Sequence, residues 1–211
     1  MKTDDLITLM THDAPVRLRY GRTLAMALGT GIAVSILLLV TTVGLRHNLT
    51  SVLETARVLF KIAVTFMLAV IAVRLALRIG RPGAATRLPA LLLAVPALMS
   101  AVAVAAELLA LPTEAWRASL VGRNALFCLF FVPVLALAPF AALFWALKRG
   151  APQSPTTAGA AAGLAAGAVA AAIYAWHCPD DSPLFLATWY TIAIAVVTAA
   201  GALLGRRLLR W

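Results

Sequence analysis

The chain has 211 residues, of which 63% are hydrophobic and 12% are charged, with a formal net charge of +10. Soluble domains contain about 45–50% apolar and about 25% charged residues, and their surface must be largely polar. The composition therefore excludes a soluble globule of this size, an intrinsically disordered chain and a disulfide-rich secreted module, and it predicts an integral membrane protein.

The basic residues lie between apolar stretches, and no motif of a nucleic-acid-binding fold accompanies them. This placement is typical of the positive-inside rule and of contact with anionic lipid headgroups. We therefore expect a lipid bilayer as a partner and no direct contact with nucleic acid.

Residues 1–22 are polar and partly acidic, and they are not typical of a secretory signal. After them come six stretches that are long and apolar enough to cross about 30 Å of hydrocarbon. The predicted fold is all-α, a polytopic membrane helix bundle built from residues 23–211. Its six transmembrane helices are expected at about 23–43, 58–77, 88–111, 125–147, 157–173 and 184–204.

The fifth stretch is short and rich in alanine and glycine. Gly159, Gly163 and Gly167 recur every four residues, so they form one stripe along a helix, and such stripes let two helices approach closely in lipid. The alternative interpretation is a flexible Ala/Gly linker, although no polar residue interrupts residues 158–173.

The distribution of lysine and arginine predicts the orientation. Twelve of these residues fall on the side that holds both termini, and four fall on the opposite side. Both termini are therefore predicted to be cytoplasmic. Lys61 and Arg74 lie inside the second stretch near its ends, and we expect their side chains to extend to the headgroups.

This topology gathers the chemically capable side chains on the outer face. Cys128 falls in the first turns of the fourth helix, and Cys178 falls in the loop between the fifth and sixth helices. His177, Asp180 and Asp181 flank Cys178. The two thiols are expected at the same depth, so they can meet if the fourth and sixth helices pack together.

Three interpretations of the cysteines remain open. Cys128 can be a small buried hydrophobe with Cys178 an incidental loop residue, although the polar sequence around Cys178 does not predict burial. The pair can form a disulfide in an oxidising compartment. It can also be a metal or redox sensor, because thiolates favour soft ions of the Zn, Cd or Cu class and the shell can be completed by His177, Asp180 and Asp181.

The residues after Cys178 also have a purely structural interpretation. Asp181 and Ser182 are good candidates for the N-cap of the sixth helix, with Pro183 at its first position. A capped helix start would hold the neighbouring thiol in a fixed place, so the cap and a site are compatible.

Several of these features together resemble a known family. They are the opening Met-Lys-Thr-Asp-Asp-Leu-Ile, the six stretches, the cysteine early in the fourth, and Cys-Pro-Asp-Asp-Ser-Pro-Leu-Phe at 178–185 followed by Trp189-Tyr190. The chain resembles the NrsF-type anti-sigma-factor family over its whole length.

The resemblance implies a regulator rather than an enzyme. Family members are multi-pass proteins of the bacterial inner membrane that hold an extracytoplasmic-function sigma factor on the cytoplasmic side and release it under heavy-metal or oxidative stress. By position, the two sensing cysteines would be Cys128 and Cys178, with no resident cofactor and at most a transient heavy-metal ion.

The N-terminal stretch fits a docking role for the sigma factor. If residues 4–11 are helical, their apolar side chains form one patch, and two acidic residues lie favourably at the helix start. The residues assigned to this contact are Asp4, Asp5, Leu6, Leu9 and Met10. A helix lying on the inner leaflet and a disordered tail are the alternatives.

Two other functions use the same residues. A membrane thiol oxidoreductase would use both cysteines, but the chain has no Cys-x-x-Cys pair. A small metal transporter would need ionisable residues along a path at mid-membrane, and the charged residues are expected near the ends of the helices instead.

Overall fold

Helices make up nearly all of the part of the chain that the computed structural model describes, which is residues 20–46, 54–81, 83–150 and 152–209. Those ranges contain no strand. The elements are α2 (Tyr20–Thr42), α4 (Ala56–Ile79), α5 (Arg87–Leu92), α6 (Ala94–Ala110), α7 (Thr113–Val121), α8 (Ala125–Lys148), α9 (Pro155–Tyr174), α10 (Pro183–Phe185), the π-helix η1 (Leu186–Tyr190) and α11 (Thr191–Leu208).

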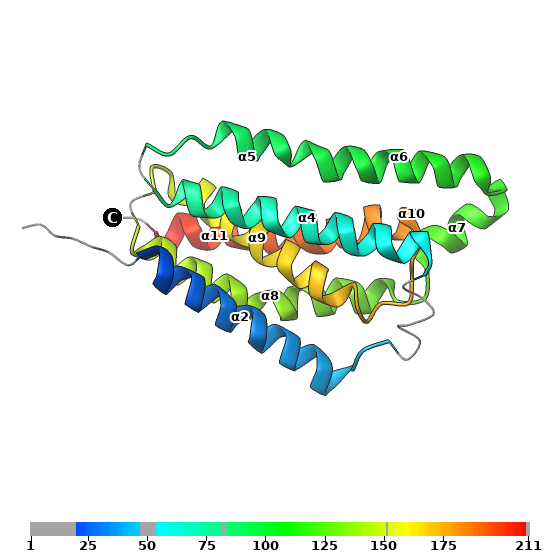
Figure 1. Ribbon diagram of the computed structural model, residues 1–211, viewed down its shortest axis with the longest axis horizontal. Coiled ribbons are helices and arrows are strands. Elements are labelled where there is room, and N and C mark those ends of the chain that lie inside the picture. Colours follow the sequence, from blue (N-terminus) through cyan, green and yellow to red (C-terminus); the bar gives the residue numbers. More distant parts are fainter. Residues whose placement is uncertain (1–19, 47–53, 82, 151, 210–211) are drawn as a thin grey trace, which may run out of the picture.

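Six helices in this part of the chain are long and apolar enough to cross a membrane. They confirm the six predicted stretches, and the third is formed by α5 and α6 in succession. The largest difference in bounds is four residues, between the predicted end at Leu204 and the observed end of α11 at Leu208. The start of α2 and the end of α11 lie at the same end of the bundle (Figure 1).

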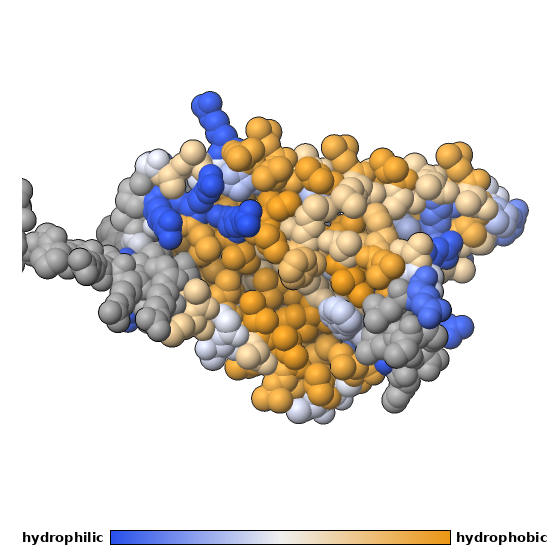
Figure 2. All heavy atoms as spheres, in the orientation of Figure 1, coloured by the Kyte–Doolittle hydropathy of each residue, from blue (hydrophilic) through white to orange (hydrophobic). Residues whose placement is uncertain are grey.

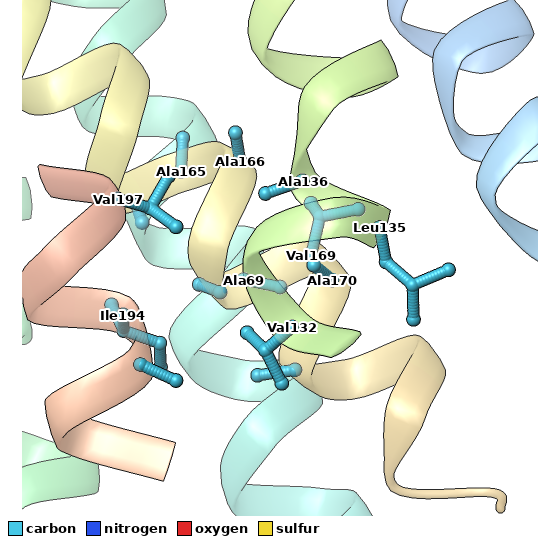
Figure 3. Packing of buried hydrophobic residues seen from close by; sticks show 14 of the residues in the cluster. Ala69, Val132, Leu135, Ala136, Ala165, Ala166, Val169, Ala170, Ile194 and Val197 are labelled. Atoms are coloured by element: carbon cyan, nitrogen blue, oxygen red, sulfur yellow. The ribbon is translucent and has the colours of Figure 1, made fainter. Parts of the chain in front are cut away.

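The alanine-rich helix α9 lies at the centre of the bundle and packs mainly on α11, α4 and α8. Small side chains bring these neighbours close, and larger ones from the surrounding helices fill the remaining space, as Val132 and Leu135 of α8 and Ile194 of α11 do (Figure 3). The interpretation of the fifth stretch as a flexible linker is therefore wrong, and the predicted helix over this stretch is confirmed.

The glycine stripe on α9 faces a second set of glycines on α11. A Cβ added at Gly159 would overlap the carbonyl oxygen of Gly201, and one added at Gly163 would lie 2.8 Å from the Cα of Thr198. Backbone therefore meets backbone along this contact, which only glycine permits. We call the contact of Gly159 and Gly163 with Gly201 and Gly205 the glycine seam.

The outer helices are packed less extensively. Helix α2 lies mainly on α8, while α5 and α6 run along the edge of the bundle against α4 and α10 (Figure 1). Their outward side chains are large and apolar, including Leu98 and Val102. Hydrophobic residues cover the middle of the face shown in Figure 2, and hydrophilic residues gather at its two ends. This distribution matches the surface that a bilayer covers.

The last apolar helix is not a regular α-helix throughout. It starts as α10, widens into the π-helix η1 over Leu186–Tyr190, and continues as α11. A π-segment contains one extra residue per turn and is frequent at functional sites. Here it lies where the chain leaves the loop that carries Cys178.

Candidate functional site

The loop of residues 175–182, between α9 and α10, lies where the ends of four other helices meet. It contacts the residues after α2, the first turns of α4, the end of α6 and the start of α8 through side chains and carbonyl groups. We call this loop, with the helix ends that it contacts, the polar end of the bundle.

Lys61, in the second turn of α4, is buried in this site. Its side chain is 1% exposed, so the expectation that it extends to headgroups is wrong. The Nζ atom donates to the carbonyl oxygen of Cys178 at 2.7 Å and to that of Asp180 at 3.3 Å, and it pairs with Asp181 Oδ1 at 2.5 Å. A lysine ammonium has three donors, and here all three have acceptors.

Asp181 joins α4 to the segment that follows α2. Its other carboxylate oxygen accepts a hydrogen bond from Arg46 Nη1 at 2.7 Å. The same segment has two further contacts with the loop: Arg46 N donates to the Trp176 carbonyl at 3.4 Å, and His177 Nδ1 lies 2.9 Å from the Gly44 carbonyl oxygen. The prediction that Asp181 caps the sixth helix is therefore wrong, because its carboxylate forms two ion pairs, with Lys61 and Arg46.

Asp180 binds the start of α8, the helix that carries Cys128. Its carboxylate accepts hydrogen bonds from the backbone N–H groups of Arg123 and Asn124, the shortest at 2.9 Å. A negative charge there also interacts favourably with the N-terminal end of the helix dipole. Gly122 makes the approach possible, because it has φ of +58° and an added Cβ would lie 2.9 Å from Asp180 Cγ.

Glu107, near the end of α6, holds the start of α10. Its Oε2 accepts from Ser182 Oγ at 2.8 Å and from the backbone N–H of Leu184 at 3.0 Å, while Ser182 Oγ accepts in turn from Phe185 N. Ser182 is thus the N-cap, as predicted. The other oxygen, Oε1, is buried without a hydrogen bond, and Arg57 Nη2 lies 3.8 Å from it.

Both cysteines are fully buried, with 0% of each residue exposed, and both are free thiols. The interpretation of Cys178 as an unburied loop residue is therefore wrong. The polar loop turns inward at this position, where the Sγ atom lies 4.0 Å from the Asp180 carbonyl oxygen. The fold brings the thiols of Cys128 and Cys178, which are 50 residues apart in the sequence, close enough for a charge on one to act on the other.

Two tyrosines enclose the thiols. Tyr174 ends α9 and Tyr190 ends η1, with ring centroids 6.0 Å apart. Both hydroxyl groups are buried, and the Cys178 thiol is the group with which each of them can share a hydrogen bond. Buried hydroxyl groups need a hydrogen-bond partner, so a change in the state of the Cys178 sulfur would act directly on both tyrosines.

Burial in this enclosure raises the pKa of the Cys178 thiol above its ordinary value. The Lys61 ammonium lowers the pKa again, but its effect is smaller than that of burial. The thiol of Cys178 is therefore protonated at neutral pH, and its nucleophilic thiolate form is scarce.

The predicted residues of the loop and the fourth helix, Cys128, His177, Cys178, Asp180 and Asp181, all lie at the polar end of the bundle. Within the described ranges, however, no group of three or more His, Cys, Asp and Glu side chains is placed to hold a metal ion. The Asp180 carboxylate is already hydrogen-bonded to backbone N–H groups, and the Asp181 carboxylate is already paired with Arg46 and Lys61. The predicted sigma-binding residues of the N-terminal stretch lie outside the described residues.

Five residues of the site were not predicted as part of it: Lys61, Arg46, Glu107, Tyr174 and Tyr190. A signal exists for Lys61 and Glu107, because an ionisable residue inside an apolar helix generally has a buried partner. No comparable signal marks the tyrosines, since buried tyrosine is common in apolar cores.

Comparison with known proteins identifies the family of this chain. A family model described as "Negative regulator of sigma F" matches residues 9–211. The chain belongs to this family. It is 36% identical over its whole length to the "Probable anti-sigma-F factor NrsF" of Azospira oryzae, which it covers completely. It is 32% identical, again over the whole of both chains, to the "Anti-sigma-F factor NrsF" of Caulobacter vibrioides. No solved structure matches it.

Proposed function

We propose that this protein is an inner-membrane anti-sigma factor. It holds an extracytoplasmic-function sigma factor on the cytoplasmic side through residues 1–22 and releases it when a heavy metal or an oxidant reacts with Cys128 and Cys178. The observation that carries the proposal is the connection between a buried thiol pair and the ion pairs that join its loop to α2 and α4. Membership in a family of negative regulators supports the regulatory role.

Membrane insertion with both termini inside is supported by six apolar helices and by the excess of lysine and arginine on the side of the termini. In this orientation the polar end faces the periplasm. The thiols are then placed where metals and oxidants arrive from outside, and the sigma-binding stretch lies at the opposite end of α2.

The ion pairs provide a route from the thiols to that stretch. The carbonyl group of Cys178 accepts from Lys61, and Asp181 links Lys61 to Arg46, which follows α2 directly. Helix α2 begins at Tyr20, ten residues after Met10, the last of the proposed sigma-binding residues. A reaction at Cys178 that moves the loop would disturb these pairs and favour a second packing of α2.

The chemistry at the thiols has two forms. Oxidation can join the sulfur atoms in a disulfide, with two thiol protons and two electrons passing to the oxidant. A soft ion of the Zn, Cd or Cu class can instead bind both thiolates. Participation of His177, Asp180 and Asp181 as further ligands stays a prediction, and it requires each side chain to leave its present partner.

Substitution of the thiols tests the sensing role. Cys128→Ser and Cys178→Ser should each abolish release of the sigma factor under cadmium or peroxide stress while repression without stress persists. A reporter for sigma-dependent transcription measures both. Thr65→Ser is the matched control, because Thr65 is buried in α4 but bonds only to carbonyl groups of its own helix. Normal induction in the double Cys→Ser variant would refute the sensing role.

Deletion of residues 2–15 tests the docking role separately. The shortened protein should still reach the membrane, because the first apolar helix is intact, but the reporter should be active without stress. Co-purification of the sigma factor with membranes should fall to background. Repression that continues in the shortened protein would exclude this stretch as the docking element.

A further inference from the structure

A long groove lies between α2 and α4, with α9 as its floor. Its lining is apolar, unlike the polar end of the bundle that surrounds the thiols. Its volume is about 700 Å³. Ile32 and Ile36 line one wall, Phe66 and Val70 line the other, and Val169 lies on the floor. Volumes of about 300–1,000 Å³ are typical of sites for small molecules.

The groove exists because its two walls are supported by different helices. Helix α2 packs mainly on α8, whereas α4 packs mainly on α9, so their apolar faces are not pressed together. The two ribbons diverge toward the end of α2 (Figure 1). Ile36 is 46% exposed and Phe66 is 64% exposed, which leaves a large apolar surface for an occupant to cover.

Arg74 is the one charged residue among the described residues that line the groove. It lies on α4 five residues before the helix ends at Ile79, about 7–8 Å along the helix axis. Its side chain is exposed, and within the described part of the chain its guanidinium has no ion pair or hydrogen bond. An exposed arginine this close to the end of an apolar helix is expected to meet an anionic headgroup, which agrees with the expectation from the sequence.

A second arginine strengthens the case for an anion. Arg78 lies one turn further along α4, on the same face as Arg74, and its Nη1 donates to the Ala85 carbonyl oxygen at 2.9 Å, so that Nε and Nη2 remain as further donors among the described residues. Two like charges at positions i and i+4 disfavour a helix. A phosphate oxygen pair near both guanidinium groups would remove this repulsion and match their planar donors.

We propose that the groove binds an anionic phospholipid, with one acyl chain between α2 and α4 and the phosphate on Arg74. An acyl chain is thin and flexible enough to follow the apolar walls. A helix from a second copy is less suitable, because three turns, about 10 Å across and 16 Å long, occupy roughly 1,200 Å³. The proposal rests on the membrane placement given under the proposed function.

Native mass spectrometry of the full chain tests this site. The protein is reconstituted in nanodiscs with equal amounts of phosphatidylglycerol and phosphatidylcholine and then released in the gas phase. One retained phosphatidylglycerol is expected for the unchanged protein, and Arg74→Gln should lower its occupancy about tenfold or more. Arg206→Gln is the control, since Arg206 is exposed in the last turn of α11 and does not line the groove.

A second pair of variants tests the acyl chain. Ile36→Trp fills the groove and should also lower retention, whereas Leu37→Trp, at a position that is 64% exposed and outside the groove, should not. Equal retention of both lipids, or retention unchanged by Arg74→Gln and Ile36→Trp, would overturn the proposal. If the unchanged protein forms a dimer and Ile36→Trp dissociates it, the groove is instead the binding site of a second copy of the chain. Extraction of the chain from membranes by alkaline carbonate would refute the membrane placement itself, separately from the lipid site.

Discussion

The glycine seam and the polar end hold the bundle together by different means. In the seam, α9 and α11 are in backbone contact along glycines, with no charge and no space for a Cβ at Gly159. At the polar end, side chains from distant segments meet through ion pairs around Lys61 and Asp181. The seam resists any change of separation, whereas the polar end depends on charges that a chemical reaction can disturb. The polar end is therefore the part of the bundle whose packing a chemical reaction can change.

The seam should give the largest loss of stability. Gly159→Ala places a methyl group against the Gly201 carbonyl oxygen, so the two helices must separate, and we expect the free energy of unfolding to fall by about 3 kcal/mol. Thermal unfolding in detergent measures the change. Gly29→Ala is the control, because nothing lies within 4 Å of an added Cβ there, and it should raise stability by about 0.5–1 kcal/mol. Equal effects of the two variants would show that the seam is not close-packed.

The polar end should respond next. Lys61→Met removes one cation from Asp181 and leaves the Cys178 carbonyl without its donor, at an expected cost of about 2–3 kcal/mol because Arg46 remains. The double variant Lys61→Met/Asp181→Asn should lose further stability in the same unfolding measurement, because it also removes the ion pair between Asp181 and Arg46.

Arg57→Met is the matched control for Lys61→Met. Arg57 is 55% exposed and its ion pair with Glu107 is long, at 3.8 Å, so the change should be below about 1 kcal/mol. A loss in the Lys61 variant as small as in the Arg57 variant would contradict a structural role for the buried lysine.

The smallest effect concerns the reactivity of Cys178. Because burial raises its pKa, the thiolate fraction at pH 7.5 is low, and alkylation by iodoacetamide in a Cys128→Ser background should be at least about tenfold slower than at an exposed cysteine. The rate should keep rising with pH above 8.5, where the rate of an exposed thiol levels off. Thr113→Cys, at an exposed position in a chain without Cys128 and Cys178, supplies that reference. Equal rates would mean that the enclosure opens freely.

Hydropathy and length were sufficient to predict the six helices, and the spacing of Gly159, Gly163 and Gly167 predicted a close contact. The partner of that contact was not predictable, because Gly201 and Gly205 are found only when the topology brings α11 against α9. Local sequence patterns describe one helix at a time. They do not say which other helices will pack against it, because that depends on the tertiary structure.

The two errors at the site have the same origin. Lys61 is five residues into α4, which fits a side chain that extends to headgroups, but its partner Asp181 lies 120 residues later in the sequence. Cys178 is surrounded by polar residues, but Tyr174 and Tyr190 enclose it from two helices. Burial was therefore decided by segments that the local sequence does not contain.

The π-helix has a consequence for how this chain tolerates length changes. Its extra residue sets the rotation of α10 relative to α11, so removing one residue within Leu186–Tyr190 would turn the two parts by about 100° against each other. With α11 locked on α9, the start of α10 would swing away from Glu107. A single-residue deletion there should uncouple the loop of residues 175–182 from α9 and α11, whose packing on each other would stay intact.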